Sequence, residues 1–395
     1  MAHAHDHGAG QLDVDVADHV GKRMWAAVAV CLVAVLVGLV ALWPSGSDRG
    51  DDPLGLDGDP VPATVISEAV EPCSYDPLLG CRQIGLIPGS GAFEGERLTF
   101  EQPLASPIRD GDAILVDISA QDGGDPLIFF YDFERSTPLL LLLLVFVTAI
   151  IVLGRWRGAG ALAGLAASLV VIVVFLLPAL LEGANAVAVA LVASGAIAFI
   201  ALFLAHGFNL ATAAALLASI ASLAITAVLA WLFVVTSKLT GLADETVGYL
   251  GALGNEINPQ GLLLAGVVIG SLGVLDDVTV TQVSAVWELK HAKPDADFAE
   301  LYSRAVRIGR DHISSTVNTL FLAYAGASLP LLLLFREAGQ SLSSAATREV
   351  VAVEIVRALV GSIGLVASVP ISTALAAAAL GTRSSPPRVE PLASE

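Results

Sequence analysis

The sequence has 395 residues, of which 55% are hydrophobic and only 15% are charged, and its formal net charge is −18. Soluble globular chains carry about 25% charged residues. The composition therefore excludes an ordinary soluble protein and favours a chain built for the lipid bilayer. The excess of negative charge also excludes nucleic acid as a partner, because proteins that bind nucleic acid present basic patches.

The chain begins with a polar tail and a first apolar stretch. Residues 1–23 are polar, small and acidic, which predicts a disordered cytoplasmic tail. Its histidines at positions 3, 5 and 7 are too few to predict a metal site. Residues 24–43 are apolar and long enough to cross a bilayer core of about 30 Å. A signal peptide has a shorter apolar region of about 7–15 residues, so we expect a retained transmembrane anchor.

Residues 45–136 differ in character from the rest of the chain. Between Pro44 and Thr137 there are 18 acidic and 5 basic residues. Turn residues separate short runs in which apolar and polar side chains alternate, as in 97–101 and 113–118. Such alternation is typical of strands with one buried face. The segment is therefore predicted to form a small β-rich domain inserted after the first helix.

Two of the three cysteines, Cys73 and Cys81, flank a short loop in this domain. If the domain lies outside the cytoplasm, the oxidising environment favours a disulfide between them. Free thiols, or half of a metal site, remain alternatives, but no pair of cysteines has the spacing of a zinc ligand pair. We predict neither a metal nor a cofactor. Cys31 lies within the first apolar stretch and is interpreted as a packing residue.

The apolar stretches resume at Pro138 and make up most of the remaining chain. They lie near residues 138–153, 160–181, 186–205, 210–235, 260–285, 313–335 and 353–379. The predicted fold is thus an all-α polytopic membrane protein of about eight transmembrane helices, with the β-rich domain after the first. Residues 138–379 would form a seven-helix bundle with a cytoplasmic loop at 286–312, and residues 380–395 a disordered cytoplasmic tail.

The orientation follows from the basic residues, which concentrate in cytoplasmic loops. With the N-terminus inside the cell, the cytoplasmic segments carry eleven basic residues: Lys22, Arg23, Arg155, Arg157, Lys290, Lys293, Arg304, Arg307, Arg310, Arg383 and Arg388. The short outer loops carry three: Lys238, Arg336 and Arg348. Both termini are therefore predicted to be cytoplasmic, and the β-rich domain to be extracytoplasmic, in a multi-pass protein of the cell membrane.

Two adjacent aspartates, Asp276 and Asp277, lie within the predicted span 260–285. An ionised aspartate at the centre of a spanning helix costs about 2.5–3.5 kcal/mol on insertion scales. Successive helical residues point about 100° apart, so the two carboxylates face different ways. Asp277 shares its face with Gly270, Gly273, Thr281 and Ser284, and we expect this face to look into the bundle. The pair is interpreted as a protonatable or cation-binding site, the alternative being a hydrogen bond from Asp277 to a neighbouring helix.

A second polar group opens the span at 313–335. Arg310 and His312 stand at its mouth, and Thr316, Asn318 and Thr319 run into it. An asparagine in apolar surroundings needs a hydrogen-bond partner, and Asp277 is the nearest candidate. His312 titrates near neutral pH in water and is a candidate proton relay, although an interfacial histidine is the alternative. These five residues join Asp276 and Asp277 as candidates for ion coupling.

Enzymatic function is not predicted. An intramembrane aspartyl protease needs two aspartates on different helices, whereas Asp276 and Asp277 are neighbours on one helix. The chain also has no GxSG serine motif, no Walker loop and no GxGxxG motif. Glu354 and Arg357, three residues apart, are interpreted as a local ion pair.

Several motifs resemble those of the YibE/F family of bacterial membrane proteins. They are GVLDDVTVTQ at 273–282, AVWEL at 285–289, RIGRDHISSTVNT at 307–319, AYAG at 323–326 and LPLLLL at 329–334. GRWRG at 154–158, AHG at 205–207 and VGSIG at 360–364 add to the resemblance, which covers about 61–379. It implies a multi-pass membrane protein and gives no substrate or catalytic residue.

Residues 270–325 alone also look like SecD/SecF and resistance-nodulation-division transporters. In those proteins an aspartate late in one helix, followed by arginine and hydroxyl residues on the next, handles a proton or sodium ion. This resemblance implies that Asp277 is the coupling carboxylate, with Arg310, Thr316 and Thr319 on the adjoining helix.

The sequence therefore predicts a transporter or export factor coupled to H⁺ or Na⁺. The alternative is a membrane-anchored interaction protein whose extracytoplasmic domain binds a partner. Besides the lipid bilayer, the partners to consider are a second copy of the chain and another membrane protein.

Overall fold

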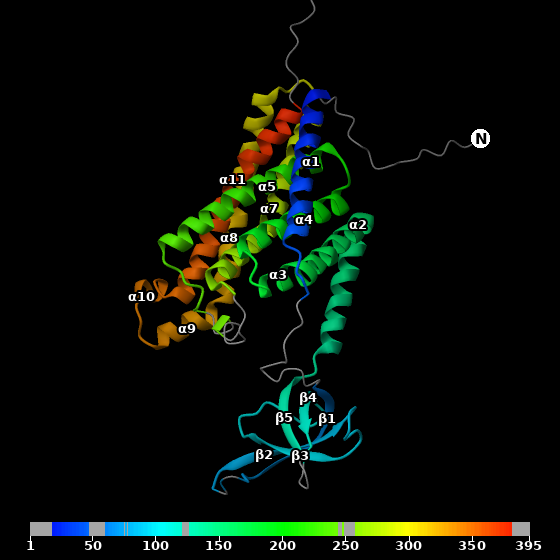
Figure 1. Cartoon of the computed structure of the whole chain (residues 1–395), viewed down its shortest axis with the longest axis vertical. Coiled ribbons are helices and arrows are strands. Elements are labelled where there is room, and N and C mark those ends of the chain that lie inside the picture. Colours follow the sequence, from blue (N-terminus) through cyan, green and yellow to red (C-terminus); the bar gives the residue numbers. More distant parts are fainter. Residues whose placement is uncertain are drawn as a thin grey trace, which may run out of the picture. The chain divides into compact units, whose positions relative to one another are not determined.

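The computed structural model describes residues 18–46, 60–74, 76, 78–120, 126–243, 247–248 and 257–380 (Figure 1). The chain divides into two compact units. One comprises Asp48–Val152, and the other comprises Met1–Ser47 together with Leu153–Glu395. The predicted tails at 1–17 and 381–395, including the three histidines near the N-terminus, lie outside the described residues.

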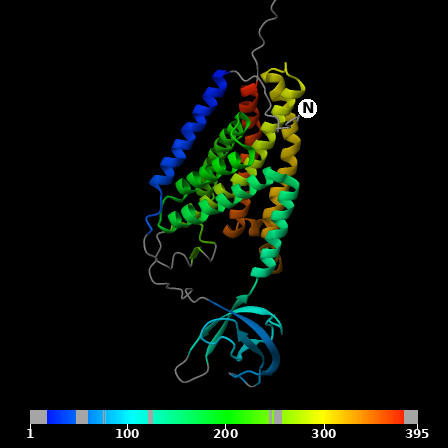
Figure 2. The same cartoon turned by 90° about the vertical axis from the view of Figure 1, so that its right-hand side faces the viewer.

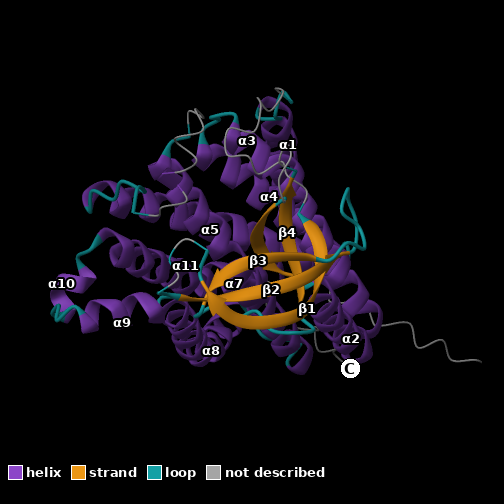
Figure 3. Cartoon of the chain, turned by 90° about the horizontal axis from the view of Figure 1, so that it is seen from below, coloured by secondary structure: helices purple, strands orange, loops and turns teal. Residues whose placement is uncertain are grey.

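The smaller unit contains an antiparallel sheet of five strands in the order β3-β2-β1-β4-β5. The strands are β1 (Val61–Pro72), β2 (Gly80–Pro88), β3 (Leu98–Pro103), β4 (Ala113–Ser119) and β5 (Leu127–Phe133). They curl into a half-barrel, as Figure 3 shows, and β3 approaches β5. The prediction of a small β-rich domain is confirmed, since β3 and β4 occupy the two segments with alternating side chains.

Alternation of side chains explains the core of this sheet, because successive residues of a strand point to opposite faces. On β4, Ile114 and Val116 have no exposed surface, whereas the next residue, Asp117, is exposed. Ile84 and Leu86 on β2 are also fully buried. At the far end of the hairpin formed by β1 and β2, a disulfide joins Cys73 to Cys81.

The larger unit is helical. Its long helices are α1 (Asp18–Ala41), α4 (Ala186–His206), α5 (Leu210–Thr236), α7 (Pro259–Ala292), α8 (Phe298–Ala327) and α11 (Glu349–Leu380). Helix α2 (Ser136–Val171) enters it and continues through a π-helical turn, η1 (Ile172–Leu176), into α3 (Leu177–Leu181). Two short helices, α9 (Leu329–Glu337) and α10 (Leu342–Ala346), lie between α8 and α11.

Among the described residues, six helices are long and apolar enough to cross a membrane, or seven if the bent pair α8–α9 counts as one span. The chain is therefore that of an integral membrane protein. We expected eight spans, and the two counts differ at 138–153 and 160–181, which both lie in the stretch of 46 residues Ser136–Leu181 that is counted once. Gly154 and Gly158 flank the junction of the two halves, which are two helices joined across a kink. Only Arg155 interrupts the helical backbone there, with φ 49° and ψ −130°.

Three other boundaries differ from the sequence prediction. Helix α1 begins at Asp18, so residues 18–23 of the expected tail form its first turns, because a helix stabilised by its apolar part extends readily into a polar flank. The expected cytoplasmic loop at 286–312 is mostly helical, since it comprises the end of α7, the connection 293–297 and the start of α8. Asp297 caps α8 by accepting a hydrogen bond from the Glu300 amide. The expected span 313–335 is bent by 58° between α8 and α9, and Pro330 lies in the first turn of α9.

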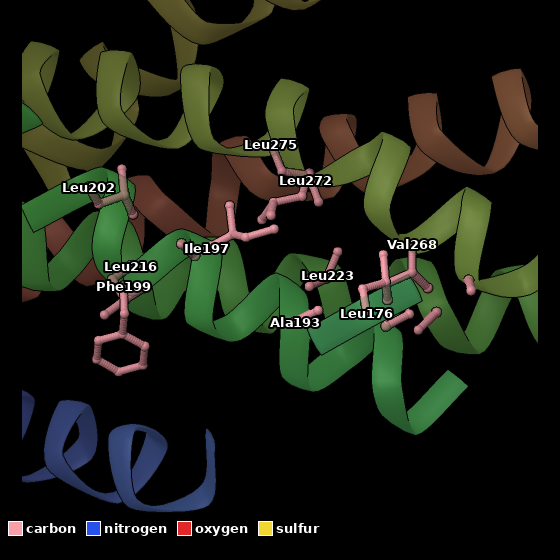
Figure 4. Close-up of a cluster of buried hydrophobic side chains, with 14 of the residues drawn as sticks. Leu176, Ala193, Ile197, Phe199, Leu202, Leu216, Leu223, Val268, Leu272 and Leu275 are labelled. Atoms are coloured by element: carbon pink, nitrogen blue, oxygen red, sulfur yellow. The ribbon is translucent and has the colours of Figure 1, made fainter. Parts of the chain in front are cut away.

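Helices α5, α7 and α11 pack against one another, and α4 packs against α7. Figure 2 shows α1, in blue, beside the green helices α4 and α5, which it contacts. Figure 4 shows part of the apolar cluster in this unit, where Leu272 and Leu275 of α7 approach Ile197 of α4 and Leu223 of α5. Glycine allows the closest approach, because a Cβ on Gly364 of α11 would collide with the Thr226 hydroxyl of α5.

Candidate functional site

The two adjacent aspartates of α7 face different surroundings. The side of α7 that packs against α4 and α5 carries Leu272, Thr279 and Val283, all buried, and half-buried Asp276 belongs to this side. Asp277 is exposed. The prediction that the face of Asp277 looks into the bundle is thus wrong for a single copy of the chain. Helices α4, α5 and α11 cover other sides of α7 and leave the side of Asp277 exposed.

The rest of the predicted stripe confirms this orientation. Gly270, Gly273, Thr281 and Ser284 are all exposed like Asp277. A Cβ added to Gly273 would meet no atom within 4 Å, so no neighbouring helix approaches there. The two carboxylates face different ways, as predicted, but Asp276 and not Asp277 lies on the side that faces the interior.

Asp276 lies beside two hydroxyl groups. Its carboxyl group lies near the Ser219 hydroxyl group of α5. Ser219 Oγ lies 2.7 Å from Thr279 Oγ1, and either atom can be the donor. Both Ser219 and Thr279 have no exposed surface. Asp276 Oδ1 is buried and has no hydrogen-bond partner in the part of the chain that the structure describes. A buried polar atom without a partner is rare and calls for an explanation.

Further polar side chains line the contact between α5, α7 and α11. They are buried and lie on the faces where these helices meet: Ser222, Thr226, Ser271, Gln282, Ser368, Ser372 and Thr373. Most of their hydroxyl groups donate to carbonyl oxygens one turn earlier in their own helix, as Thr226 does to Ser222 at 2.8 Å. Ser222 Oγ itself has no partner.

Gln282 joins three helices at one end of this polar contact. Its Nε2 donates to the Ala305 carbonyl oxygen of α8 at 2.8 Å and to Thr373 Oγ1 of α11 at 2.7 Å. Gly309 of α8 gives room for this contact, because a Cβ there would lie 2.8 Å from Gln282 Oε1. Gln282 therefore fixes the position of α7 relative to α8 and α11.

The candidate residues of α8 are not gathered around Asp276. Arg310, Asn318 and Thr319 are exposed. Thr316 Oγ1 donates to the His312 carbonyl oxygen at 3.0 Å, and Thr319 Oγ1 donates to that of Ser315 at 3.0 Å, so both bond within their own helix.

Asn318 has a different neighbour from the one expected. It lines a groove of about 300 Å³ between α8 and α11, together with Ser314 and Ser362. Within the described residues, no hydrogen bond joins Asn318 to Asp277. His312 is half-buried, and its Nε2 has no partner, which makes it the one candidate on α8 with an unsatisfied buried atom.

Sequence reasoning missed Ser219 and the other hydroxyl residues of α5. The signal was present, since Ser219, Ser222 and Thr226 are spaced so that they share one face of a helix. Glu354 and Arg357 form the local ion pair that was predicted, with 2.6 Å between Oε1 and Nη1. Among the described residues no group of three histidine, cysteine, aspartate or glutamate side chains could hold a metal ion.

The family model for YibE/F-like proteins matches residues 142–382 of this chain. The matched range contains α4, α5, α7, α8 and α11, and so includes Asp276, Ser219 and Thr279; the strands lie outside it. No curated protein and no solved structure matches the chain. Because the matched residues make up more than half of the sequence, the chain belongs to the YibE/F family.

Proposed function

We propose that this protein is a multi-pass transporter or export factor of the cell membrane, coupled to the movement of H⁺ or Na⁺, and that Asp276 is the carboxylate that the coupling ion visits. No residue is assigned a catalytic role. The observation that carries the proposal is the buried, unpartnered Oδ1 of Asp276 on a helix able to span the membrane.

The energetic argument rests on the cost of such a group. An aspartate within a membrane-spanning helix lowers the stability of insertion by roughly 2.5–3.5 kcal/mol when ionised, and intramembrane carboxylates commonly mark ion pathways. A merely structural aspartate would have both oxygens satisfied by neighbouring donors. Asp276 lies near Ser219, and its buried Oδ1 has no hydrogen-bond partner among the described residues, so the site has a free acceptor for an incoming ion.

The same proposal includes eight membrane crossings with both termini cytoplasmic. The stretch Ser136–Leu181 would be about 69 Å long at about 1.5 Å per residue, more than twice a bilayer core of about 30 Å. A break at Arg155 would divide it into two crossings, with Arg155 and Arg157 on the cytoplasmic side, where basic residues concentrate. The β half-barrel and its disulfide would then lie outside the cytoplasm.

Ion flux tests the proposal. The full-length protein would be reconstituted into liposomes that contain a pH-sensitive dye or a sodium-sensitive dye, and flux would be driven by an imposed membrane potential. We expect Asp276→Asn to reduce the flux by on the order of a hundredfold, as loss of a positioned proton-transfer group does. Asp277→Asn is the matched control, since it removes the same charge from the exposed neighbour, and it should retain most of the flux.

Two results would contradict the proposal. Equal flux in wild type and Asp276→Asn, with both proteins folded and inserted, would remove Asp276 from the pathway. No flux above that of empty liposomes with either ion would favour the alternative of a membrane-anchored interaction protein.

A further inference from the structure

Asp276, Ser219 and Thr279 form a short chain of groups that can exchange hydrogen bonds. Ser219 Oγ and Thr279 Oγ1 are 2.7 Å apart, with no assigned donor. Thr279 Oγ1 also lies 3.1 Å from the main-chain carbonyl oxygen of Asp276. Both hydroxyl groups are fully buried, so water does not compete for their hydrogen bonds.

This chain has two complete hydrogen-bond arrangements. When Asp276 is ionised, Ser219 donates to the carboxylate and Thr279 donates to Ser219. When the carboxyl group gains a proton, it donates to Ser219, Ser219 donates to Thr279, and Thr279 donates to the main-chain oxygen of Asp276. The second arrangement differs from the first by one added proton and by rotation of two hydroxyl groups, while all heavy atoms stay in place.

We propose that these three residues form a switch specific for the proton, so that the coupling ion is H⁺ and not Na⁺. The inference rests on the proposed function and names the ion for the same site. Ser219 acts as a positioning residue, because its hydroxyl group lies near the carboxyl group that receives the proton. Thr279 serves as the second member, which accepts or donates according to the protonation state of Asp276.

The packing around the switch supports a proton over a metal cation. A hard cation in a protein is surrounded by many oxygen ligands, about six to eight for Ca²⁺. Here one carboxylate and two hydroxyl groups converge, and the helices pack closely, as the contact of Gly364 with Thr226 shows. The groove of about 300 Å³ lies between α8 and α11, not at Asp276. A proton needs no such space.

Few other ionisable groups face α7 from the helices packed against it. Helix α5 has none, and α4 has only His206 at its C-terminal end. The remaining charged or titratable groups on the nearby parts of α8 and α11 are Arg310, Asp311, His312, Tyr324, Glu349, Glu354 and Arg357. On α7 itself Asp277 is the neighbour. The test must therefore separate Asp276 from Asp277 and from His312.

Infrared difference spectroscopy makes this separation, because a protonated carboxyl group has its own C=O stretching band. Spectra of the full-length protein in lipid nanodiscs would be recorded at neutral and at acidic pH. We expect acidification to produce a carboxyl band that is absent in Asp276→Asn and present in Asp277→Asn and His312→Gln. Replacing sodium chloride by choline chloride should leave the band unchanged.

The matched pair Ser219→Ala and Ser222→Ala tests the switch itself. Both serines are fully buried on one face of α5, but Ser222 Oγ has no hydrogen-bond partner. In Ser219→Ala the carboxyl band should move to higher frequency, because the protonated group loses its acceptor, whereas Ser222→Ala should leave it in place. If Ser219→Ala does not fold, Thr279→Val, which keeps the shape of the side chain, should shift the pH at which the band appears.

The inference is overturned if sodium suppresses the band at constant pH, if both serine variants give the same spectrum, or if the band persists in Asp276→Asn. The outcome is independent of the flux assay. If the carboxyl band responds as expected but the protein shows no ion flux, the proposed transport is refuted and the proton switch is retained. Flux driven by sodium in a protein without the band would keep transport and refute the switch.

Discussion

The two units of this chain differ in the polar side chains that they bury, because among the described residues only the helical unit buries serines and threonines beside its apolar side chains. In the half-barrel the side chains without exposed surface are aliphatic, such as Ile84 and Leu86. In the helical unit Ser219 and Thr279 are equally buried, while Val228 is 63% exposed and Leu359 is 55% exposed. Water drives apolar groups inward, whereas lipid is as apolar as leucine and leaves polar groups and close packing to hold helices together. The buried side chains are thus those expected for a half-barrel surrounded by water and a helical unit surrounded by lipid.

The aliphatic core of the half-barrel gives the largest expected effect. Ile84→Ala should destabilise this unit by about 2–5 kcal/mol, the cost of deleting a large buried side chain. Hydrogen exchange of the strand peptides in the full-length protein would measure the loss. Phe129→Ala on β5 is the control, because Phe129 is 58% exposed and its loss should leave exchange nearly unchanged. Equal effects of the two substitutions would refute the assigned core.

The disulfide is the next test of the half-barrel. The residues it joins are 8 apart in sequence, and the chain-entropy model gives about 2.5 kcal/mol for closing a loop of that length. The double variant Cys73→Ser with Cys81→Ser should lose this amount, measured by the same exchange experiment. Cys31→Ser, which removes the free cysteine of α1, should leave the strands unaffected. Unchanged exchange in the double variant would show that the bond contributes nothing.

Close packing in the helical unit predicts a smaller penalty. Gly364→Ala should destabilise the unit by about 1–3 kcal/mol, the usual cost of overpacking, because the added Cβ would collide with Thr226. Thermal unfolding of the full-length protein in detergent would show the change. Gly273→Ala adds the same methyl group where nothing lies within 4 Å, so it should be neutral or stabilising. A reversed order of the two variants would contradict the packing of α5 on α11.

The smallest effect concerns Glu101, a half-buried carboxylate of β3. Glu101 accepts hydrogen bonds from the Ser74 hydroxyl at 2.7 Å and from the Ser74 amide at 3.1 Å. These bonds, and one from Gln83, hold the pKa of Glu101 below its ordinary value. The folded pKa is thus lower than the unfolded one, so the stabilisation is present above the unfolded pKa and is lost as pH falls through the folded pKa.

Hydrogen exchange at Ser74, corrected for intrinsic rates, would report this loss. Protection should be full near neutral pH and decline as the pH falls through the lowered pKa of Glu101. In Glu101→Gln the protection should be lower and independent of pH over this range. Protection that stays constant to low pH in the wild type would contradict the assigned role of Glu101.

The parts of the structure that depend on local pattern could be predicted from the sequence. Alternation located β3 and β4, and uninterrupted apolar runs located α4, α5 and the first part of α7. Local signals failed where a residue far along the chain decides the outcome. Ser219 becomes significant only because Thr279, 60 residues later, packs against it. Likewise the choice between Asp276 and Asp277 depends on which side of α7 the helices α4 and α5 cover.

The kink in α2 illustrates a second limit. The basic residues Arg155 and Arg157 indicate a membrane boundary, and Gly154 and Gly158 beside them are residues that often follow the end of a helix. The backbone breaks only at Arg155, and helical residues continue on both sides of it. The sequence thus indicates where the boundary lies, whereas the form of the break depends on the backbone.

Chemical modification of the two aspartates tests the central claim most directly. A hydrophobic carbodiimide reacts with protonated carboxyl groups, and mass spectrometry of the full-length protein in membranes would locate the product. The account predicts modification of Asp276 that increases as the pH is lowered and blocks ion flux, also in Asp277→Asn. Modification confined to Asp277, or an Asp276 that is modified fully without any change in flux, would contradict it.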